Sequence, residues 1–195
     1  MGQELARVHE RIAAAAERSG RKGRDITLVA VTKYLPPERT DLIRQAMEAG
    51  IRHLAENRVQ DAAKKIPLLA DFKDQAPACW HMIGHLQSNK VNKAAELFDR
   101  VDSLDRWETA EMLDRRCGEL GKKMQVLWEI KLSGEDAKTG LPEGHLAAVL
   151  EKCKRLRNLE VKGLMTMGPA GGDPQAARAV FRRLRGLLPA GSCAL

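Results

Sequence analysis

The chain has 195 residues, of which 44% are hydrophobic and 30% are charged, and its formal net charge is +7 at pH 7. This length supports one domain with a sizeable core, and the composition excludes an intrinsically disordered chain. No apolar stretch approaches the roughly 20 residues of a membrane-spanning helix, and the first residues form no apolar signal core. We therefore expect a globular protein of the cytoplasm, where the four widely spaced cysteines stay reduced.

Helix-type and strand-type patterns alternate along the chain. An amphipathic helix is predicted over residues 3–19, where Leu5, Val8 and Ile12 recur at helical spacing before Gly20. Six units follow, each with a short apolar strand and then an amphipathic helix. The strands are predicted at 26–33, 51–55, 79–83, around 101, at 124–132 and at 160–166. The helices are predicted at 38–49, from after 57 to about 69, and at 88–97, 106–120, 142–156 and 174–188.

This alternation favours a parallel sheet with helical crossovers, either as an open doubly wound sheet or as a closed (β/α)8 barrel. No G-x-G-x-x-G sequence follows a predicted strand, so a dinucleotide-binding fold has no direct support. Lys33, Asn57 and Ser103 stand at the ends of predicted strands. Polar residues at strand ends favour the barrel, whose functional groups lie at the C-terminal ends of its strands. A closed barrel needs eight units, however, and the chain has room for six.

Lys33 ends the apolar strand predicted at 26–33. An ammonium beside an apolar core is costly unless it is paired or neutral, and a neutral lysine amine attacks carbonyl groups. Lys33 is therefore the first candidate for chemistry. The residues alone leave one alternative open, in which this strand-end lysine simply extends its amine into solvent.

Other strand-end residues have structural interpretations. Asn57 suits a turn or helix cap, and Met165 suits packing in the core. His81 and His85 are four residues apart, but residues 79–83 are predicted as a strand, which does not bring such a pair together as a helix does. We therefore expect no metal site.

The basic residues offer a nucleic-acid-binding module as an alternative function. Two basic clusters, at 152–157 and 178–185, lie on predicted helices with apolar residues at helical spacing, a pattern typical of solvated helix faces. The three Phe, three Trp and one Tyr are not interleaved with the basic runs. A stacking platform for single strands is thus poorly supported, and no known binding motif is present.

Four stretches carry more specific motifs, which follow one another along most of the chain. Residues 28–33 read L-V-A-V-T-K, residues 55–60 read A-E-N-R-V-Q, residues 80–90 read W-H-M-I-G-H-L-Q-S-N-K, and residues 163–165 read G-L-M. In this order and spacing they resemble the YggS/PROSC family of pyridoxal phosphate homeostasis proteins. The third stretch matches the family signature W-H-x-I-G-x-L-Q-x-N-K almost residue for residue. Its Ser88 is expected to cap the following helix.

The resemblance implies a single domain over residues 1–195 that binds pyridoxal 5′-phosphate. Its fold would be a (β/α)8 TIM barrel of the alanine-racemase N-terminal-domain type, incomplete because about six βα units are present. The resemblance also implies that Lys33 holds the cofactor as an internal aldimine and that Asn57 and Met165 lie beside it. The family role is cofactor homeostasis without established catalysis, with apo-enzymes that depend on the cofactor as recipients.

Two features depart from the family pattern. Glu129 and Lys131 replace the usual Q-x-N ending of a strand, where they could alter the barrel interior or pair with each other. The chain ends at Leu195, where the family continues into segments that supply the last barrel strands and most phosphate-binding groups. The resemblance therefore implies weak binding of the cofactor by these 195 residues.

A racemase-like enzyme that uses pyridoxal phosphate is the other alternative. Racemisation needs acid–base groups on both faces of the substrate carbanion. Tyr34 is the only tyrosine, and in an extended strand it would point to the side opposite Lys33. We therefore expect a binding protein rather than an enzyme.

Overall fold

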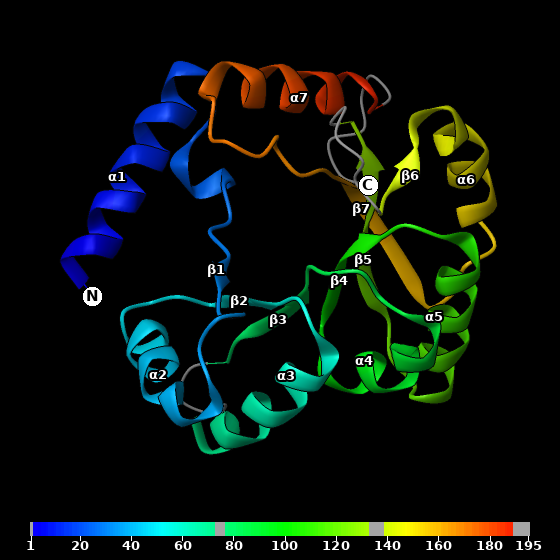
Figure 1. The fold of residues 1–195 in the computed structure, drawn as a ribbon, viewed down its shortest axis with the longest axis horizontal. Helices are drawn as coiled ribbons and strands as arrows, with labels where there is room; N and C mark the ends of the chain where they lie inside the picture. Colours follow the sequence, from blue (N-terminus) through cyan, green and yellow to red (C-terminus); the bar gives the residue numbers. More distant parts are fainter. Residues whose placement is uncertain (1, 73–76, 133–138, 189–195) are drawn as a thin grey trace. The chain divides into compact units, whose positions relative to one another are not determined.

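A computed structural model describes residues 2–72, 77–132 and 139–188. Strands and helices alternate along the chain, as Figure 1 shows. The hydrogen-bonded order of the strands is β1-β2-β3-β4-β5-β6, with β7 paired to β5, and every pair with a recorded register is parallel. The predicted parallel sheet with helical crossovers is confirmed.

The elements follow the predicted order. The strands are β1 (Ala30–Val31), β2 (His53–Glu56), β3 (Cys79–Met82), β4 (Arg100–Leu104), β5 (Met124–Lys131), β6 (Leu141–Pro142) and β7 (Leu159–Met165). The α-helices are α1 (Gly2–Arg18), α2 (Thr40–Glu48), α3 (Val59–Lys65), α4 (Val91–Leu97), α5 (Trp107–Glu119), α6 (Leu146–Cys153) and α7 (Pro174–Gly186). Short 3-10 helices lie at Gly23–Asp25, Pro37–Arg39, Ile66–Phe72, Ser88–Lys90 and Glu143–His145. The six predicted units are confirmed, and β6 is an addition too short to show a period of its own.

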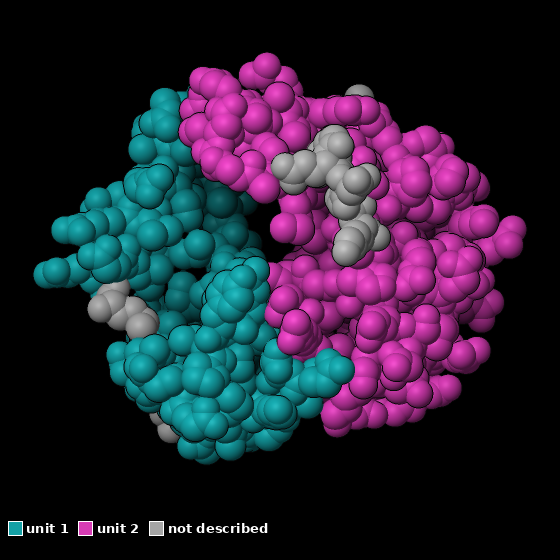
Figure 2. All heavy atoms as spheres, viewed as in Figure 1, with its two compact units in different colours: residues 1–56, 60–80 teal, residues 57–59, 81–195 magenta. Residues whose placement is uncertain are grey.

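The chain divides into two compact units, coloured separately in Figure 2. Unit 1 comprises Met1–Glu56 and Gln60–Trp80, and unit 2 comprises Asn57–Val59 and His81–Leu195. The single domain expected over residues 1–195 stays a prediction. None of the helices in the described part of the chain is long and apolar enough to cross a membrane.

Helix α2 of unit 1 shows how the sequence sets a local boundary. Its buried residues, Ile43 and Met47, are four positions apart and therefore share one face of the helix. Gly50 follows the helix with φ at +103°, a conformation that costs glycine little. The Gly50 amide donates to the Met47 carbonyl at 3.0 Å, and the Ile51 amide donates to that of Ala46 at 3.0 Å. The chain then enters β2, so the helix predicted at 38–49 ends close to its predicted boundary.

Strand β1 is much shorter than the buried strand predicted at 26–33. Only Ala30 and Val31 have strand geometry, and Val31 is 50% exposed. In the described chain β1 pairs with β2 alone, which makes it an edge strand with one side open. Tertiary pairing, rather than the apolar pattern, therefore decides how much of this run is a strand.

Unit 2 is built around β5, which pairs with β4, β6 and β7. The register brings Val126 opposite Val101 and Val161, so branched apolar side chains meet across three strands. Helices α4 and α5 pack against each other and lie beside this part of the sheet (Figure 1). The residues of the unit 2 core that are no more than 1% exposed include Met82, Leu86, Phe98, Leu104, Leu113, Met124, Trp128 and Ile130.

The expected cap at Ser88 is wrong. Ser88 is the first residue of the 3-10 helix, whose N-cap is Gln87, and α4 has Lys90 as its N-cap. Neither N-cap side chain makes a capping hydrogen bond. Because Ser88 already lies inside a helical turn, it does not take the extended backbone of a capping residue.

Candidate functional site

Lys33 lies in a tight turn directly after β1. The Leu35 amide donates to the Thr32 carbonyl at 2.9 Å, which closes this turn. Lys33 is half-buried and borders a cavity of about 200 Å³. The other lining residues, all in unit 1, are Tyr34, Leu35, Pro36, Pro37, Asp61, Lys64 and Lys65. The structure thus places the predicted amine beside a cavity of its own unit.

The expected separation of Lys33 and Tyr34 is wrong. The Lys33 Nζ atom lies over the Tyr34 ring, 4.9 Å from its centroid. The alternation of a strand does not apply here because the strand ends at Val31 and both residues lie in the turn. Tyr34 is 88% exposed, so this cation–π contact is worth about 0.5–1 kcal/mol at most.

The chemistry of the Lys33 amine fits a carbonyl-bearing cofactor. Among the described residues, no carboxylate forms an ion pair with it. A primary amine beside a cavity is a group that an aldehyde ligand could meet. The role of Lys33 in holding the cofactor stays a prediction.

A buried ionic network lies directly under this turn, within unit 1. The Lys65 Nζ atom donates to Glu56 Oε1 at 2.7 Å and to the Thr32 carbonyl at 2.9 Å. The Thr32 hydroxyl lies 2.5 Å from the same Glu56 oxygen. The Lys65 and Glu56 side chains are 2% and 0% exposed, so each would be a costly isolated charge without the other.

Sequence reasoning missed Lys65, although a signal was present. Lys65 stands three residues after buried Ala62 in α3, on the same face of that helix. A lysine on an apolar face indicates a buried partner. Glu56, at the end of β2, is that partner, and its Oε2 atom makes no hydrogen bond in the described chain.

Asn57 is half-buried and belongs to unit 2, where its backbone packs against Gly84. A Cβ atom on Gly84 would lie 2.2 Å from the Asn57 carbonyl oxygen, closer than any real contact. Gly84 therefore allows an approach that no other residue type allows. This contact fixes the Asn57 backbone, while the predicted role of its side chain beside a cofactor stays a prediction.

Met165 is the last residue of β7, half-buried and in register with Glu129 of β5. Burial raises the pKa of the Glu129 carboxyl, and nearby Asp105 raises it further. Thr139 donates its hydroxyl to Glu129 Oε1 at 3.2 Å, and this bond and His85 act in the opposite direction. The role of Met165 beside a cofactor stays a prediction.

Of the two alternatives for Glu129 and Lys131, the one in which their side chains pair is wrong. In the described chain these two side chains form no ion pair; Glu129 is 7% exposed, whereas Lys131 is an exposed residue. Glu129 is bonded instead by Thr139, which comes from beyond the strand.

Unit 2 contains two histidine–carboxylate pairs. One joins His81 of β3 to Asp102 of β4, and the other joins His85 and Asp105, which follow these strands. His81 Nδ1 is 2.5 Å from Asp102 Oδ2, and His85 Nδ1 is 2.8 Å from Asp105 Oδ2. Because an ionised carboxylate only accepts, Nδ1 of each ring is the donor. Arg106 contacts the other nitrogen of His85 at 2.9 Å. Sequence reasoning missed both carboxylates, because no local pattern relates residues some 20 positions apart.

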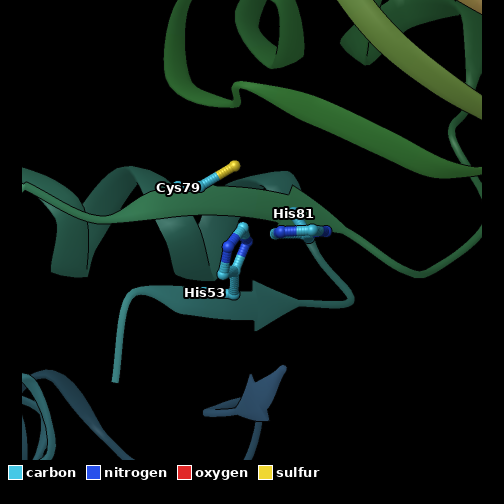
Figure 3. A group of neighbouring side chains, drawn as sticks. All are labelled: His53, Cys79 and His81. Carbon is cyan, nitrogen blue, oxygen red and sulfur yellow. The ribbon is translucent and has the colours of Figure 1, made fainter. Parts of the chain in front are cut away.

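Figure 3 shows Cys79 and His81 on β3 and His53 on β2. Within unit 1, the nearest ligand atoms of His53 and Cys79 lie within 4.8 Å of each other. His81 is engaged by Asp102 through Nδ1. That the protein has no metal site stays a prediction.

The three predicted cofactor residues are divided between the two units. Lys33 belongs to unit 1, with its cavity and the Glu56–Lys65 network, while Asn57 and Met165 belong to unit 2. Each therefore has a defined local environment: a turn for Lys33, a backbone contact with Gly84 for Asn57, and a strand end for Met165.

Comparisons with known proteins agree with the motifs. The family model of the alanine racemase N-terminal domain matches residues 4–193. A pyridoxal phosphate homeostasis protein of Aquifex aeolicus is 36% identical over 185 residues, which are 95% of this chain and 78% of that protein. An unknown protein from Bifidobacterium adolescentis has a solved structure with a TM-score of 0.85 and 34% identity, covering 95% of this chain and 76% of that one.

The PipY protein of Synechococcus elongatus provides a structure with pyridoxal phosphate bound. It is 37% identical to this chain, with a TM-score of 0.75, and the match covers 92% of this chain and 79% of PipY. Sequence identity at this level over most of both chains shows that the two proteins belong to one family. The chain belongs to the family of pyridoxal phosphate homeostasis proteins and has the fold of the alanine racemase N-terminal domain.

Proposed function

We propose that this protein binds pyridoxal 5′-phosphate through Lys33 and serves the homeostasis of that cofactor. The observation that carries the proposal is the Lys33 amine, which borders a cavity of about 200 Å³ and forms no ion pair within the described chain. The bound cofactor in PipY supports the same ligand.

Bound pyridoxal phosphate supplies an aldehyde, which condenses with a primary amine and releases water. Lys33 is the residue that presents this amine, and it must be neutral to act as the nucleophile. Arginine could not replace Lys33 because a guanidinium stays protonated.

The cavity beside Lys33 also suits an anionic ligand. Three lysines, Lys33, Lys64 and Lys65, and one aspartate, Asp61, line it. Lysine amines donate hydrogen bonds to phosphate oxygens. In the same proposal, Asn57 and Met165 contact the cofactor from the ends of β2 and β7.

The proposed role is that of a carrier rather than an enzyme. The relatives carry the name of homeostasis proteins, and this supports a function in which cofactor-dependent apo-enzymes receive the bound molecule. A cytoplasmic location belongs to the same proposal. Turnover of alanine or serine enantiomers by the purified protein, lost in Lys33→Ala, would contradict the carrier role and favour a racemase.

Borohydride trapping tests the binding proposal directly. The protein is mixed with pyridoxal 5′-phosphate and reduced, and the product is analysed by intact mass and peptide mapping. We expect one label on Lys33 and its loss in Lys33→Ala. Lys93→Ala is the control because Lys93 is an exposed lysine that does not line this cavity. Labels spread over exposed lysines, or no label at all, would exclude a specific site at Lys33.

A further inference from the structure

The buried Glu56–Lys65 pair is connected to Lys33 through one peptide group. Lys65 donates to the carbonyl of Thr32 at 2.9 Å, and that carbonyl belongs to the peptide bond that leads into Lys33. The same carbonyl accepts the Leu35 amide at 2.9 Å. The Lys65 amine and the Leu35 amide therefore both fix the peptide group that precedes the Lys33 side chain.

Glu56 orients the Lys65 ammonium and also engages the residue before Lys33. Its Oε1 atom lies 2.7 Å from Lys65 Nζ and 2.5 Å from the Thr32 hydroxyl. A hydroxyl has one hydrogen, and the shorter contact assigns it to Glu56 rather than to the Ala55 carbonyl at 3.2 Å. Thr32 is thus fixed through its carbonyl by Lys65 and through its side chain by Glu56.

Burial makes this arrangement rigid. The Lys65 and Glu56 side chains are 2% and 0% exposed, so water does not compete for their hydrogen bonds. The backbone before Lys33 needs this support because β1 pairs with β2 at only two register positions. The strand alone gives Lys33 little support.

We propose that Glu56 and Lys65 are positioning residues for Lys33, which hold the Thr32–Lys33 peptide so that the Lys33 amine is presented for covalent attachment. This inference rests on the proposed function. In the attachment step, the neutral Lys33 nitrogen bonds to the aldehyde carbon, and the carbonyl oxygen leaves as water with both amine hydrogens. Lys65 takes no part in that exchange of bonds and acts through the backbone alone.

Two ligands distinguish a misplaced Lys33 side chain from general damage to the fold. Pyridoxal 5′-phosphate has the aldehyde, whereas pyridoxine 5′-phosphate has an alcohol there and cannot attach to lysine. A misplaced Lys33 weakens binding of the first ligand and leaves the second nearly unchanged. A damaged fold weakens both. The ratio of the two dissociation constants therefore reports on the placement of Lys33.

The test uses the full chain with Glu56→Gln and Lys65→Met combined, so that no single charge is left buried. The double variant Glu56→Leu with Lys65→Met is a second form, because apolar replacement of a buried ion pair is often tolerated. Arg44→Met is the matched control. It removes a different ion pair of the same unit, that of Arg44 with Asp71.

We expect affinity for the aldehyde ligand and the rate of Lys33 labelling to fall about ten-fold in either double variant, the effect of one charge-assisted hydrogen bond. The affinity of the double variants for the alcohol ligand should change by less than about two-fold, and so should both affinities of the control variant. An unchanged ratio of affinities in a folded double variant overturns the positioning role. If the parent protein shows no Lys33 label, the proposed function itself fails, and this inference fails with it.

Discussion

His81 and Asp102 form a buried contact in unit 2, with Nδ1 of the imidazole 2.5 Å from Oδ2 of the carboxylate. Asp102 also accepts from Arg100 Nε at 3.3 Å, and Arg100 extends to Gln125 at 2.9 Å. One carboxylate therefore connects strands β3, β4 and β5 through side chains. This chain of contacts supplements the backbone ladder between the same strands.

Replacing this carboxylate should destabilise the protein. Asp102→Asn keeps the size of the side chain but removes the charge that His81 and Arg100 share, so we expect a loss of about 1–3 kcal/mol in the free energy of unfolding. Urea unfolding measures it. Glu119→Gln is the control, because its ion pair with Arg116 lies on the surface and should contribute less than about 1 kcal/mol. Equal effects of the two changes would contradict the role given to Asp102.

Glu129 should make stability depend on pH. Burial raises the pKa of its carboxyl in the folded protein above the unfolded value of about 4.3, so the folded state binds the proton more tightly. The cost of the ionised Glu129 carboxylate to the free energy of unfolding therefore grows as the pH rises from about 4.3 to the folded pKa. Glu129→Gln removes the titration, and its stability relative to the parent should rise over that interval.

Urea unfolding at several pH values checks this difference between Glu129→Gln and the parent. Glu160→Gln should show the opposite trend, because the hydrogen bond from Lys162 lowers the pKa of Glu160 and its stabilisation is present above the unfolded pKa. The effect of Glu160 should be smaller because that carboxyl is partly exposed. A pH-independent difference for Glu129→Gln would show that its carboxyl is not perturbed.

Gly84→Ala should be harmful although alanine is small. The added Cβ would lie 2.2 Å from the Asn57 carbonyl oxygen, so the backbone must shift, at a cost of about 1–3 kcal/mol. Gly144→Ala is the matched control, since no atom lies within 4 Å of its added Cβ. Thermal unfolding should show a large drop for the first variant and little change for the second. Equal melting temperatures would exclude the close approach at Gly84.

Cys117 should react slowly with alkylating reagents. Burial raises the pKa of its thiol, so little thiolate forms, and the side chain is fully covered. Peptide mapping after iodoacetamide treatment should show Cys117 labelled far faster in concentrated urea than in the folded protein. Comparable rates in the two conditions would mean that this part of α5 opens readily.

The order of the elements could be predicted because the apolar period is a local property of the chain. The spacing of Ile43 and Met47 fixed the face of α2, and Gly50 marked its end. The extent of β1 could not be predicted, since its length depends on which neighbouring strand it pairs with. The predicted orientation of Tyr34 was wrong for the same reason, because Tyr34 lies in a turn and not in a strand.

Much of the candidate site could not be predicted from local sequence patterns. Lys33 stood out because a single amine followed an apolar run, and the surrounding motifs gave it a chemical meaning. The partners of Lys65 are 9 and 33 residues away, and that of His81 is 21 residues away. Only folding brings such groups together, so one sequence indicates that a buried lysine needs a partner but not which residue it is.

The uneven pairing of the strands sets an order for local opening. Strand β5 has partners along both edges, whereas β1 has one partner and two register positions. Amide hydrogens of β5 should therefore be among the last to exchange with deuterated solvent, and those of β1 should exchange sooner. The backbone that leads into Lys33 thus depends for its order on the buried Glu56–Lys65 pair more than on strand pairing.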